Sequence, residues 1–135
     1  MTNNILPDVW GPHGWKFMHY VALGYPEQPT DQDKAAYRAY FEALQNVLPC
    51  KSCATHYQEN LRKFPVGEHL KDRDSLMRWT ISLHNEVNLA THKPVIPYET
   101  ALKLYTQRQF PLLSLLSKIV IAVLLLIGAS YLLRR

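Results

Sequence analysis

Apolar and aromatic residues recur every three or four positions over most of residues 1–109, and no segment alternates in the manner of a β-strand. The first such stripe predicts one buried helix face, and it comprises Trp15, Met18, His19, Ala22 and Leu23. A second stripe predicts another buried face, and it comprises Tyr37, Tyr40, Phe41, Leu44 and Val47. The pattern therefore favours helices throughout this part of the chain.

Prolines and capping residues divide the pattern into five helices. Pro12 can start the first helix, Thr30–Asp33 can cap the second, and Asp72 or Asp74 can cap the fourth. The approximate bounds are 12–25, 30–48, 50–63, 72–90 and 98–109. Because the connecting loops are brief, the sequence predicts an all-α fold, a four-helix bundle plus a short fifth helix.

The C-terminal segment has a different composition. Residues 112–133 are predominantly apolar and carry a single charge, Lys118, and no polar face interrupts the run from Ile119 to Ile127. A helix of this length can cross a hydrocarbon core of about 30 Å. A buried core helix is the alternative. We expect a C-terminal transmembrane helix, and hence a soluble domain at 1–109 and an anchor at 110–135.

The N-terminal residues suggest how such an anchor would be inserted. Met1 to Trp10 lack both the basic start and the apolar run of a signal peptide. We therefore expect a single-pass, tail-anchored membrane protein whose soluble domain faces the cytosol. The net charge of +4 is modest, and the charged residues are scattered along the chain. The sequence contains no basic run interleaved with aromatic residues, so we expect no nucleic-acid partner.

Two cysteines, Cys50 and Cys53, form the strongest chemical motif, a C-x-x-C pair. As a structural disulfide the pair would close a very short loop, which stabilises a fold by only about 2 kcal/mol. Pro49 stands where a helix can begin, so Cys50 would lie at a helix N-terminus, which favours the thiolate. The motif therefore favours redox chemistry.

The pair by itself leaves three chemistries open. A thioredoxin-like site would follow a strand, whereas the preceding chain is helical. Structural zinc needs four ligands, so two of six histidines would have to join the cysteines; the candidates are His13, His19, His56, His69, His84 and His92. The third possibility is dithiol–disulfide exchange beside a bound redox cofactor.

Two further clusters are candidates for binding such a cofactor. Trp10 to Trp15, followed by His19, combine indoles and a histidine with Gly11, which would permit close approach of a flat ligand, although a core role is the common alternative. On the fourth helix, His84 shares a face with Asn88 and with Thr80. These polar groups either cap neighbouring helices or bind a polar ligand such as a dinucleotide, with Lys93 near a phosphate or a flavin ring.

In combination, these motifs resemble the ERV/ALR family of FAD-dependent sulfhydryl oxidases. The resemblance covers about residues 10–105 and rests on motifs that occur in the family order. These are Gly11-x-x-x-Trp15-x-x-x-His19, Pro49-Cys50-x-x-Cys53, and Trp79 followed by His84-Asn85-x-Val87-Asn88 and Lys93-Pro94. The resemblance implies a helical bundle that holds FAD at the mouth of its four main helices, usually as a homodimer.

The resemblance also implies a role for each motif residue. The implied cofactor-binding residues are Gly11, Trp15, His19, His56, His84, Asn85, Val87, Asn88, Lys93 and Tyr105, without a metal site. A substrate thiolate would attack Cys50, and Cys53 would then pass electrons to FAD, which reduces O2 to H2O2. Tyr105 replaces a tryptophan that is frequent in the family.

Departures from the family pattern narrow the implied role. No second cysteine pair and no further structural disulfide are possible, because Cys50 and Cys53 are the only cysteines. A thiol-bearing protein, such as a small C-x-x-C carrier, would therefore have to reduce Cys50 directly. With one cysteine pair and an expected anchor, the chain resembles family members encoded by large cytoplasmic DNA viruses, and this resemblance implies a virion membrane as an alternative location. The remaining alternatives are a non-catalytic, membrane-anchored zinc-binding or scaffold module and a disulfide reductase or isomerase.

Overall fold

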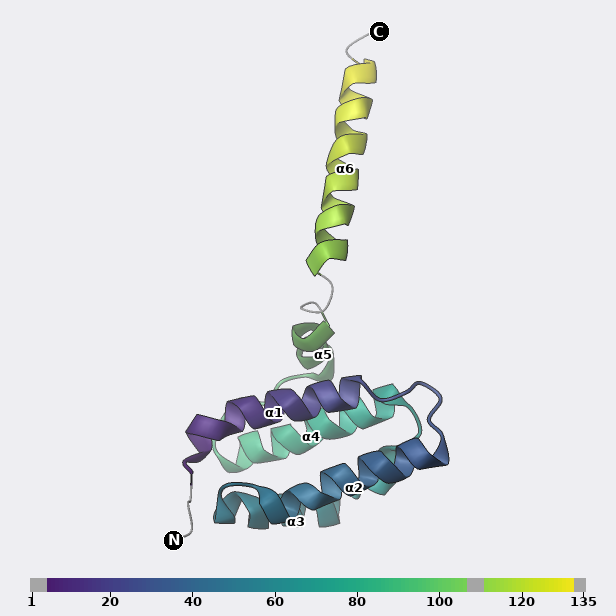
Figure 1. Cartoon of the computed structure of the whole chain (residues 1–135). Helices are drawn as coiled ribbons and strands as arrows, with labels where there is room; N and C mark the ends of the chain where they lie inside the picture. Colours follow the sequence, from purple (N-terminus) through teal and green to yellow (C-terminus); the bar gives the residue numbers. More distant parts are fainter. Residues whose placement is uncertain (1–4, 107–110, 133–135) are drawn as a thin grey trace. The chain divides into compact units, whose positions relative to one another are not determined.

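A computed structural model describes residues 5–106 and 111–132, and within them it contains six α-helices, one 3-10 turn and no strand (Figure 1). The elements are α1 (Pro7–Leu23), α2 (Asp31–Val47), α3 (Lys51–Lys63), η1 (Val66–His69), α4 (Arg73–Ala90), α5 (Tyr98–Thr106) and α6 (Pro111–Leu132). The all-α fold is confirmed. The predicted end of the fifth helix, at 107–109, lies outside the described residues.

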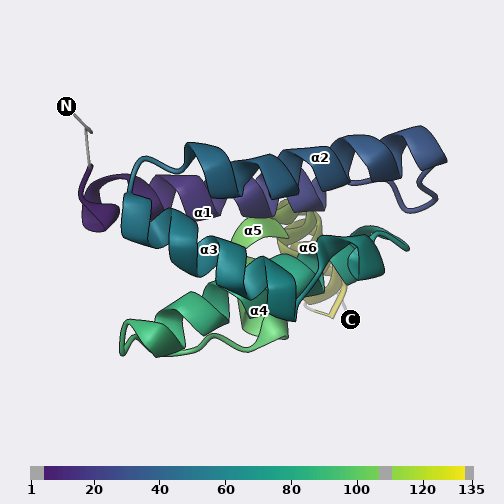
Figure 2. The same cartoon turned by 90° about the horizontal axis from the view of Figure 1, so that it is seen from below.

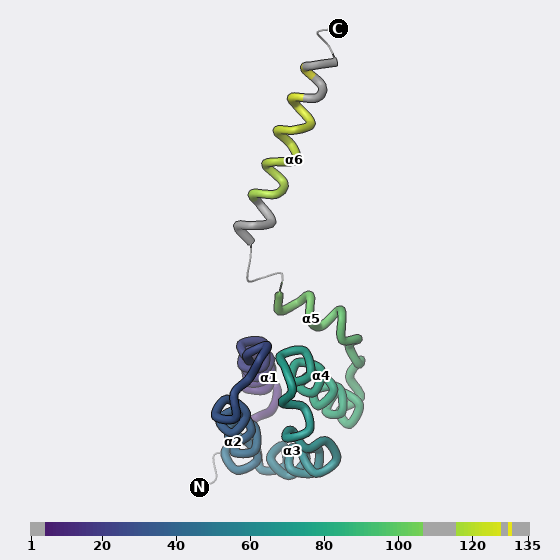
Figure 3. Tube along the Cα trace, turned by 90° about the vertical axis from the view of Figure 1, so that its right-hand side faces the viewer, coloured from purple at the N-terminus to yellow at the C-terminus, as the bar shows by residue number. Residues whose placement is uncertain are grey.

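The first compact unit ends at Ala101 and contains α1 to α4. Helix α1 packs against α4, and α2 packs against α3 (Figures 1 and 2). Seen along their axes, the four helices surround one core (Figure 3). Phe41 and Trp79 meet edge to face at the centre of this core, with ring centroids 4.9 Å apart.

Buried polar groups in this core find partners on neighbouring elements. The Trp79 indole donates to the Phe64 carbonyl at 2.9 Å, and the Tyr57 hydroxyl donates to the Phe41 carbonyl at 2.9 Å. Tyr25 donates likewise to the Leu70 carbonyl at 2.9 Å. Each bond avoids the free-energy penalty of an unpaired buried donor, so the aromatic rings can be buried together with their polar atoms.

Local capping rules placed three of the helix starts correctly. Thr30 and Asp33 form a reciprocal capping box at the start of α2, and the Asp72 carboxylate accepts from the Ser75 amide at the start of α4. Cys50 is the N-cap of α3. In each case the signal lies within four residues of sequence, which is why it can be read without the tertiary structure.

The predicted start of the first helix at Pro12 is wrong, because α1 begins at Pro7. Pro7 occupies the first turn, where a missing N–H costs nothing. Pro12 lies inside the helix and removes only the bond that its nitrogen would make to the Asp8 carbonyl, near the exposed N-terminus. As a result, Trp10 and Gly11 lie on the helix instead of preceding it.

The predicted buried stripe of the second helix is correct only in part. Phe41 is fully buried, whereas Val47, the last residue of α2, is 67% exposed. The chain leaves the helix directly after Val47 to reach the cysteine loop, so this last turn is not covered. Helix α2 therefore carries apolar surface near the cysteine pair.

The second compact unit begins at Leu102 and includes α6. The side chains described from Leu116 to Ile127 are exposed. Among the described residues, no helix combines the length and the apolar character needed to cross a membrane. The predicted anchor at 110–135 extends beyond these residues, since 110 and 133–135 lie outside them.

Candidate functional site

Cys50 and Cys53 form a disulfide at the start of α3, with their Cα atoms 5.2 Å apart. The Cys50 sulfur occupies the N-cap position and accepts a hydrogen bond from the Cys53 amide at 3.2 Å. The Ser52 hydroxyl lies 3.3 Å from the same sulfur. Because an N–H group of the first helical turn donates to this sulfur, the site favours a thiolate at Cys50 when the disulfide is opened.

The two cysteines differ in exposure. Cys50 is 2% exposed, whereas Cys53 is half-buried. The chain near the N-terminus lies against the loop that precedes Cys50, since the Ile5 amide donates to the Pro49 carbonyl at 2.9 Å. The predicted role of Cys50 as the sulfur attacked by substrate therefore requires access to a covered position, and it stays a prediction.

The packing of α1 against α4 brings the two predicted cofactor-binding clusters together. The Trp15 and His84 rings are stacked, with centroids 4.2 Å apart and planes within 6°. His19 is buried beside them, and its Nε2 lies 3.1 Å from Nδ1 of His84. Its Nδ1 lies 3.2 Å from the Thr80 hydroxyl oxygen. Thr80, His19 and His84 thus form a series of hydrogen-bonded groups, and the Trp15 indole stacks on the last of them.

Both imidazoles of this cluster are neutral at physiological pH. Burial, together with the neighbouring His84, lowers the pKa of His19 to about 3. Burial, together with the Lys93 ammonium, lowers the pKa of His84 to about 4. Each ring therefore has one N–H donor and one acceptor nitrogen, and can bind a ligand by hydrogen bonds but not by charge.

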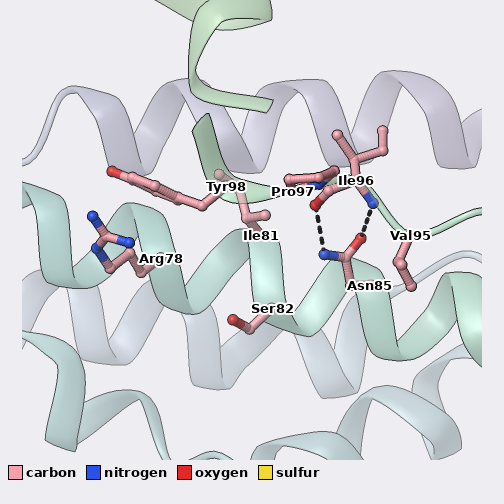
Figure 4. Close-up of a pocket in the computed structure, with 8 residues that line it drawn as sticks. All are labelled: Arg78, Ile81, Ser82, Asn85, Val95, Ile96, Pro97 and Tyr98. Atoms are coloured by element: carbon pink, nitrogen blue, oxygen red, sulfur yellow. Dashed lines mark hydrogen bonds between the residues drawn. The ribbon is translucent and has the colours of Figure 1, made fainter. Parts of the chain in front are cut away.

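Asn85 has a structural partner that the sequence did not reveal. Its amide donates to the Ile96 carbonyl at 2.9 Å and accepts from the Ile96 amide at 3.0 Å, so it fixes the segment that follows α4 (Figure 4). Asn85 also borders a cavity of about 320 Å³, and Arg78 and Tyr98 line this cavity as well. The Arg78 guanidinium lies over the Tyr98 ring and forms a salt bridge with Asp74, so its positive charge already has a partner in the folded chain.

The end of α4 positions Lys93. His92 adopts a left-handed conformation with φ of 56°, and the His92 and Lys93 amides donate to the Leu89 and Asn88 carbonyls. This pairing is a Schellman motif, which turns the chain sharply. The Lys93 ammonium then lies 3.7 Å from the Asp8 carboxylate, at the start of α1. Lys93 therefore lies near the histidine cluster, as its effect on the pKa of His84 requires.

Other predicted site residues differ in how clearly the structure supports a ligand contact. Asn88 is buried and Val87 is half-buried on α4. His56 is exposed on α3 and forms no contact with the histidine cluster among the described side chains. Tyr105 lies on α5 in the second compact unit. Nothing places these four residues against a cofactor, and their roles stay predictions.

Features of α1 fit a flat ligand such as FAD. A Cβ atom added at Gly11 would meet no neighbouring atom within 4 Å, so packing does not account for this glycine. The Trp10 indole N–H is buried and has no hydrogen-bond partner among the described residues. Nε2 of His84, which forms no hydrogen bond among the described residues, is a third available group. Open space, an unused donor and a stacked indole together suit an aromatic ligand with polar substituents.

The donor set does not suit a metal. Within the described chain, no group of three or more His, Cys, Asp or Glu side chains is arranged to hold an ion. The cysteines are joined to each other, and the two close histidines are hydrogen-bonded to each other. The described side chains of the first compact unit thus form a disulfide and an aromatic cluster, but no metal centre.

The bundle has a disulfide at a helix start and a stacked indole–imidazole cluster, an arrangement that suits thiol-redox chemistry beside a planar cofactor. The chain belongs to the Erv1/Alr family, whose family model matches residues 12–110. The resemblance drawn from the sequence motifs is thereby confirmed.

Relatives of this chain include viral and cellular proteins. The probable FAD-linked sulfhydryl oxidase R368 of Acanthamoeba polyphaga mimivirus is 44% identical over 98 residues, which cover 72% of this chain and 68% of the relative. The mitochondrial FAD-linked sulfhydryl oxidase ERV1 of Saccharomyces cerevisiae is 34% identical over 90 residues, which cover 65% and 47%. This chain thus spans about half the length of the yeast relative.

A solved structure supports the same assignment. The FAD-binding domain of Erv1 from Saccharomyces cerevisiae matches with a TM-score of 0.72 and 28% identity, over 77% of this chain and 97% of that domain. The match extends over nearly all of the yeast domain, so the four-helix unit described above corresponds to a known FAD-binding fold.

Proposed function

We propose that this chain is an FAD-linked sulfhydryl oxidase, which couples 2 R–SH + O2 to R–S–S–R + H2O2. The observation that carries the proposal is the pairing of a disulfide at the start of α3 with the Trp15–His84 stack, in one four-helix unit. FAD, when bound, supplies a two-electron acceptor that can be reoxidised by O2. Gly11, Trp15 and His84 would hold it, the first by leaving space and the others by stacking and hydrogen bonding.

The thiol chemistry belongs to the chain itself. A substrate thiolate attacks the Cys50 sulfur, the Cys50–Cys53 bond breaks, and Cys53 leaves as a thiolate. A second substrate thiol then releases the substrate disulfide and leaves Cys50 reduced. The Cys53 amide that donates to the Cys50 sulfur stabilises negative charge there, which favours the reduced pair as a product.

Absorbance and oxygen consumption test this function together. The purified full-length chain should be yellow, with flavin absorbance near about 450 nm, and should consume O2 when a dithiol is added. Cys53→Ser should keep the bound flavin and lose oxidase activity. A colourless protein would refute the oxidase and favour a scaffold, whereas a yellow protein that reduces disulfides without consuming O2 would indicate a reductase.

We further propose that the substrate is a small C-x-x-C protein that reduces Cys50 directly. This rests on the cysteine count, because the chain has no second pair to relay electrons. Since Cys50 is covered, a partner that can insert an exposed thiol at the start of α3 fits best. With the partner supplied in its disulfide form, the Cys50 thiolate of a Cys53→Ser chain should attack it and trap a mixed disulfide, whereas a Cys50→Ser chain should trap little.

Assembly and location are also proposals. The homodimer is supported by exposed apolar surface on α1 and α2, where Phe17 is 61% exposed and lies edge-on to Tyr40. The tail anchor is supported by the apolar run 112–133, with the catalytic domain in the cytosol. Relatives in African swine fever virus and an iridescent virus support a viral origin. Light scattering of the chain and carbonate extraction of membranes test the first two proposals.

A further inference from the structure

Thr80 forms the buried end of the polar chain that reaches the Trp15 stack. Its side chain is 1% exposed, and its hydroxyl lies 2.9 Å from the Met77 carbonyl oxygen. A carbonyl oxygen can only accept, so the single hydroxyl hydrogen points to Met77. The hydroxyl oxygen then faces His19 Nδ1, at 3.2 Å, as an acceptor.

This arrangement fixes which nitrogen of each histidine carries the proton. His19 Nδ1 must donate to Thr80, so its Nε2 is the acceptor of a neutral ring. Nδ1 of His84 lies 3.1 Å from that acceptor and must donate to it. His84 Nε2 is consequently left with a lone pair, and no hydrogen bond to this nitrogen is formed among the described residues.

We propose that Thr80 is a positioning residue that fixes the His19–His84 tautomers, so that His84 presents Nε2 as an acceptor to an N–H or O–H group of the bound cofactor. The parallel Trp15 ring fixes the plane of His84 and therefore the direction of this lone pair. The acceptor discriminates against carbonyl and phosphate oxygens, and it selects the amino, imide or hydroxyl groups of a flavin dinucleotide. The inference rests on the proposed function for the identity of that ligand.

Nitrogen NMR of the full-length apoprotein, kept in solution with a mild detergent, tests the tautomers without any cofactor. We expect Nδ1–H and an unprotonated Nε2 on both His19 and His84 at neutral pH. An Nε2–H on either ring would overturn the proposal, because it would mean that Thr80 donates to His19. Since this measurement uses the unaltered chain, its outcome does not depend on the folding of a variant.

Variants of Thr80 test the consequence for binding, with FAD as the probe and quenching of its fluorescence as the readout. Thr80→Val keeps the shape and removes the hydroxyl, and it should weaken FAD binding about tenfold while releasing the tautomers. Thr80→Ser should restore both. Thr55→Val is a matched control, since Thr55 is an exposed helical threonine that donates to the Lys51 carbonyl.

The two levels of the hypothesis fail in different ways. If Thr80→Val binds FAD as tightly as the unaltered chain, Thr80 has no positioning role. If the unaltered chain binds no FAD at all, the proposed function fails, whereas the NMR result still decides whether Thr80 sets the tautomers. A thermal melt of each apoprotein variant separates a loss of affinity from a loss of folded protein.

Discussion

The indole of Trp15 and the imidazole of His84 lie parallel, 4.2 Å apart, although they come from the first and the fourth helix. This contact joins two motifs that the sequence shows far apart. Flat rings of this kind suit stacking with a planar ligand. The relationship therefore links the packing of α1 on α4 to cofactor binding.

Replacing Trp15 tests this link. Trp15→Ala should weaken FAD binding by about 1 kcal/mol or more, because stacked aromatic pairs contribute that much beyond buried area. Trp15→Phe retains a flat ring and should lose less. The measurement is a titration of each apoprotein with FAD. Equal affinities for the alanine and phenylalanine variants would show that the indole is a packing residue only.

Acid should destabilise the fold through His19 and His84, because burial keeps both rings neutral in the folded chain. The pKa values of His19 and His84 are lowered from 6.5 to about 3 and about 4, respectively. Below pH 6.5 the unfolded chain therefore binds more protons than the folded chain does. Stability is complete above about pH 6.5, falls as the pH drops below it, and levels off once the folded rings titrate. Each ring contributes about 1.4 kcal/mol for each pH unit below 6.5, so the loss between pH 7 and pH 4.5 should be on the order of 5 kcal/mol.

Urea denaturation between pH 7 and pH 4.5 measures this effect. The carboxylates with lowered pKa values, Asp33 and Asp74, titrate below 3.8 and contribute outside this window. His19→Gln should flatten the pH dependence. A stability that is constant from pH 7 to pH 4.5 in the unaltered chain would contradict buried, neutral histidines.

Local signals account for the part of this structure that the sequence predicts well. Thr30 and Asp72 cap their helices through neighbours three residues away, and Cys50 starts α3 directly after Pro49. Such contacts are contained in the sequence pattern itself. The family motifs added the expectation that residues of α1 and α4 share a cofactor site.

Tertiary contacts explain what could not be predicted. The pairing of Asn85 with Ile96 depends on the path of the chain after α4, and no local pattern specifies it. The exposure of Val47 depends on where the cysteine loop leaves the bundle. Helical spacing places Thr80 on the face of His84, but its bond to His19 depends on the packing of α1. Periodicity identifies a face and not its partner.

Asn85 should be a stability residue for the segment after α4. Asn85→Leu removes a donor and an acceptor that bind Ile96 and leaves both backbone groups unpaired, so it should cost about 1–3 kcal/mol. Chemical denaturation measures the loss, and faster amide exchange at Ile96 locates it. Ser82→Ala is a control, because Ser82 is exposed beside the same cavity. Unchanged exchange at Ile96 would disprove the assignment.

His92 should be replaceable by glycine with a gain in stability. Its left-handed backbone, with φ of 56°, costs free energy for a residue with a Cβ atom, and its side chain is exposed. We expect His92→Gly to raise the free energy of unfolding by about 1 kcal/mol, and the β-branched His92→Val to lower it. Denaturation midpoints of the two variants give the comparison. A destabilised glycine variant would show that the imidazole itself supports the turn.

Gly11 and Gly14 provide a matched pair, because both lie in α1 but only Gly14 lies against another side chain. A Cβ at Gly14 would lie 3.0 Å from the Trp10 ring, whereas a Cβ at Gly11 would enter open space. Gly11→Ala should therefore stabilise the apoprotein by about 1 kcal/mol through helix propensity. Gly14→Ala should gain less or lose stability, because the Trp10 ring has to shift.

Gly11→Ala should weaken cofactor binding, although it should stabilise the apoprotein. If FAD occupies the open space, the added methyl group of Gly11→Ala displaces it and weakens binding about tenfold, in spite of the more stable apoprotein. Melting of the apoprotein and titration with FAD measure the two effects separately. A Gly11→Ala chain that is both more stable and equally able to bind FAD would place the cofactor elsewhere on the bundle. Opposite signs for stability and affinity at one residue cannot arise from a general folding defect, so they would locate the ligand beside the first helix.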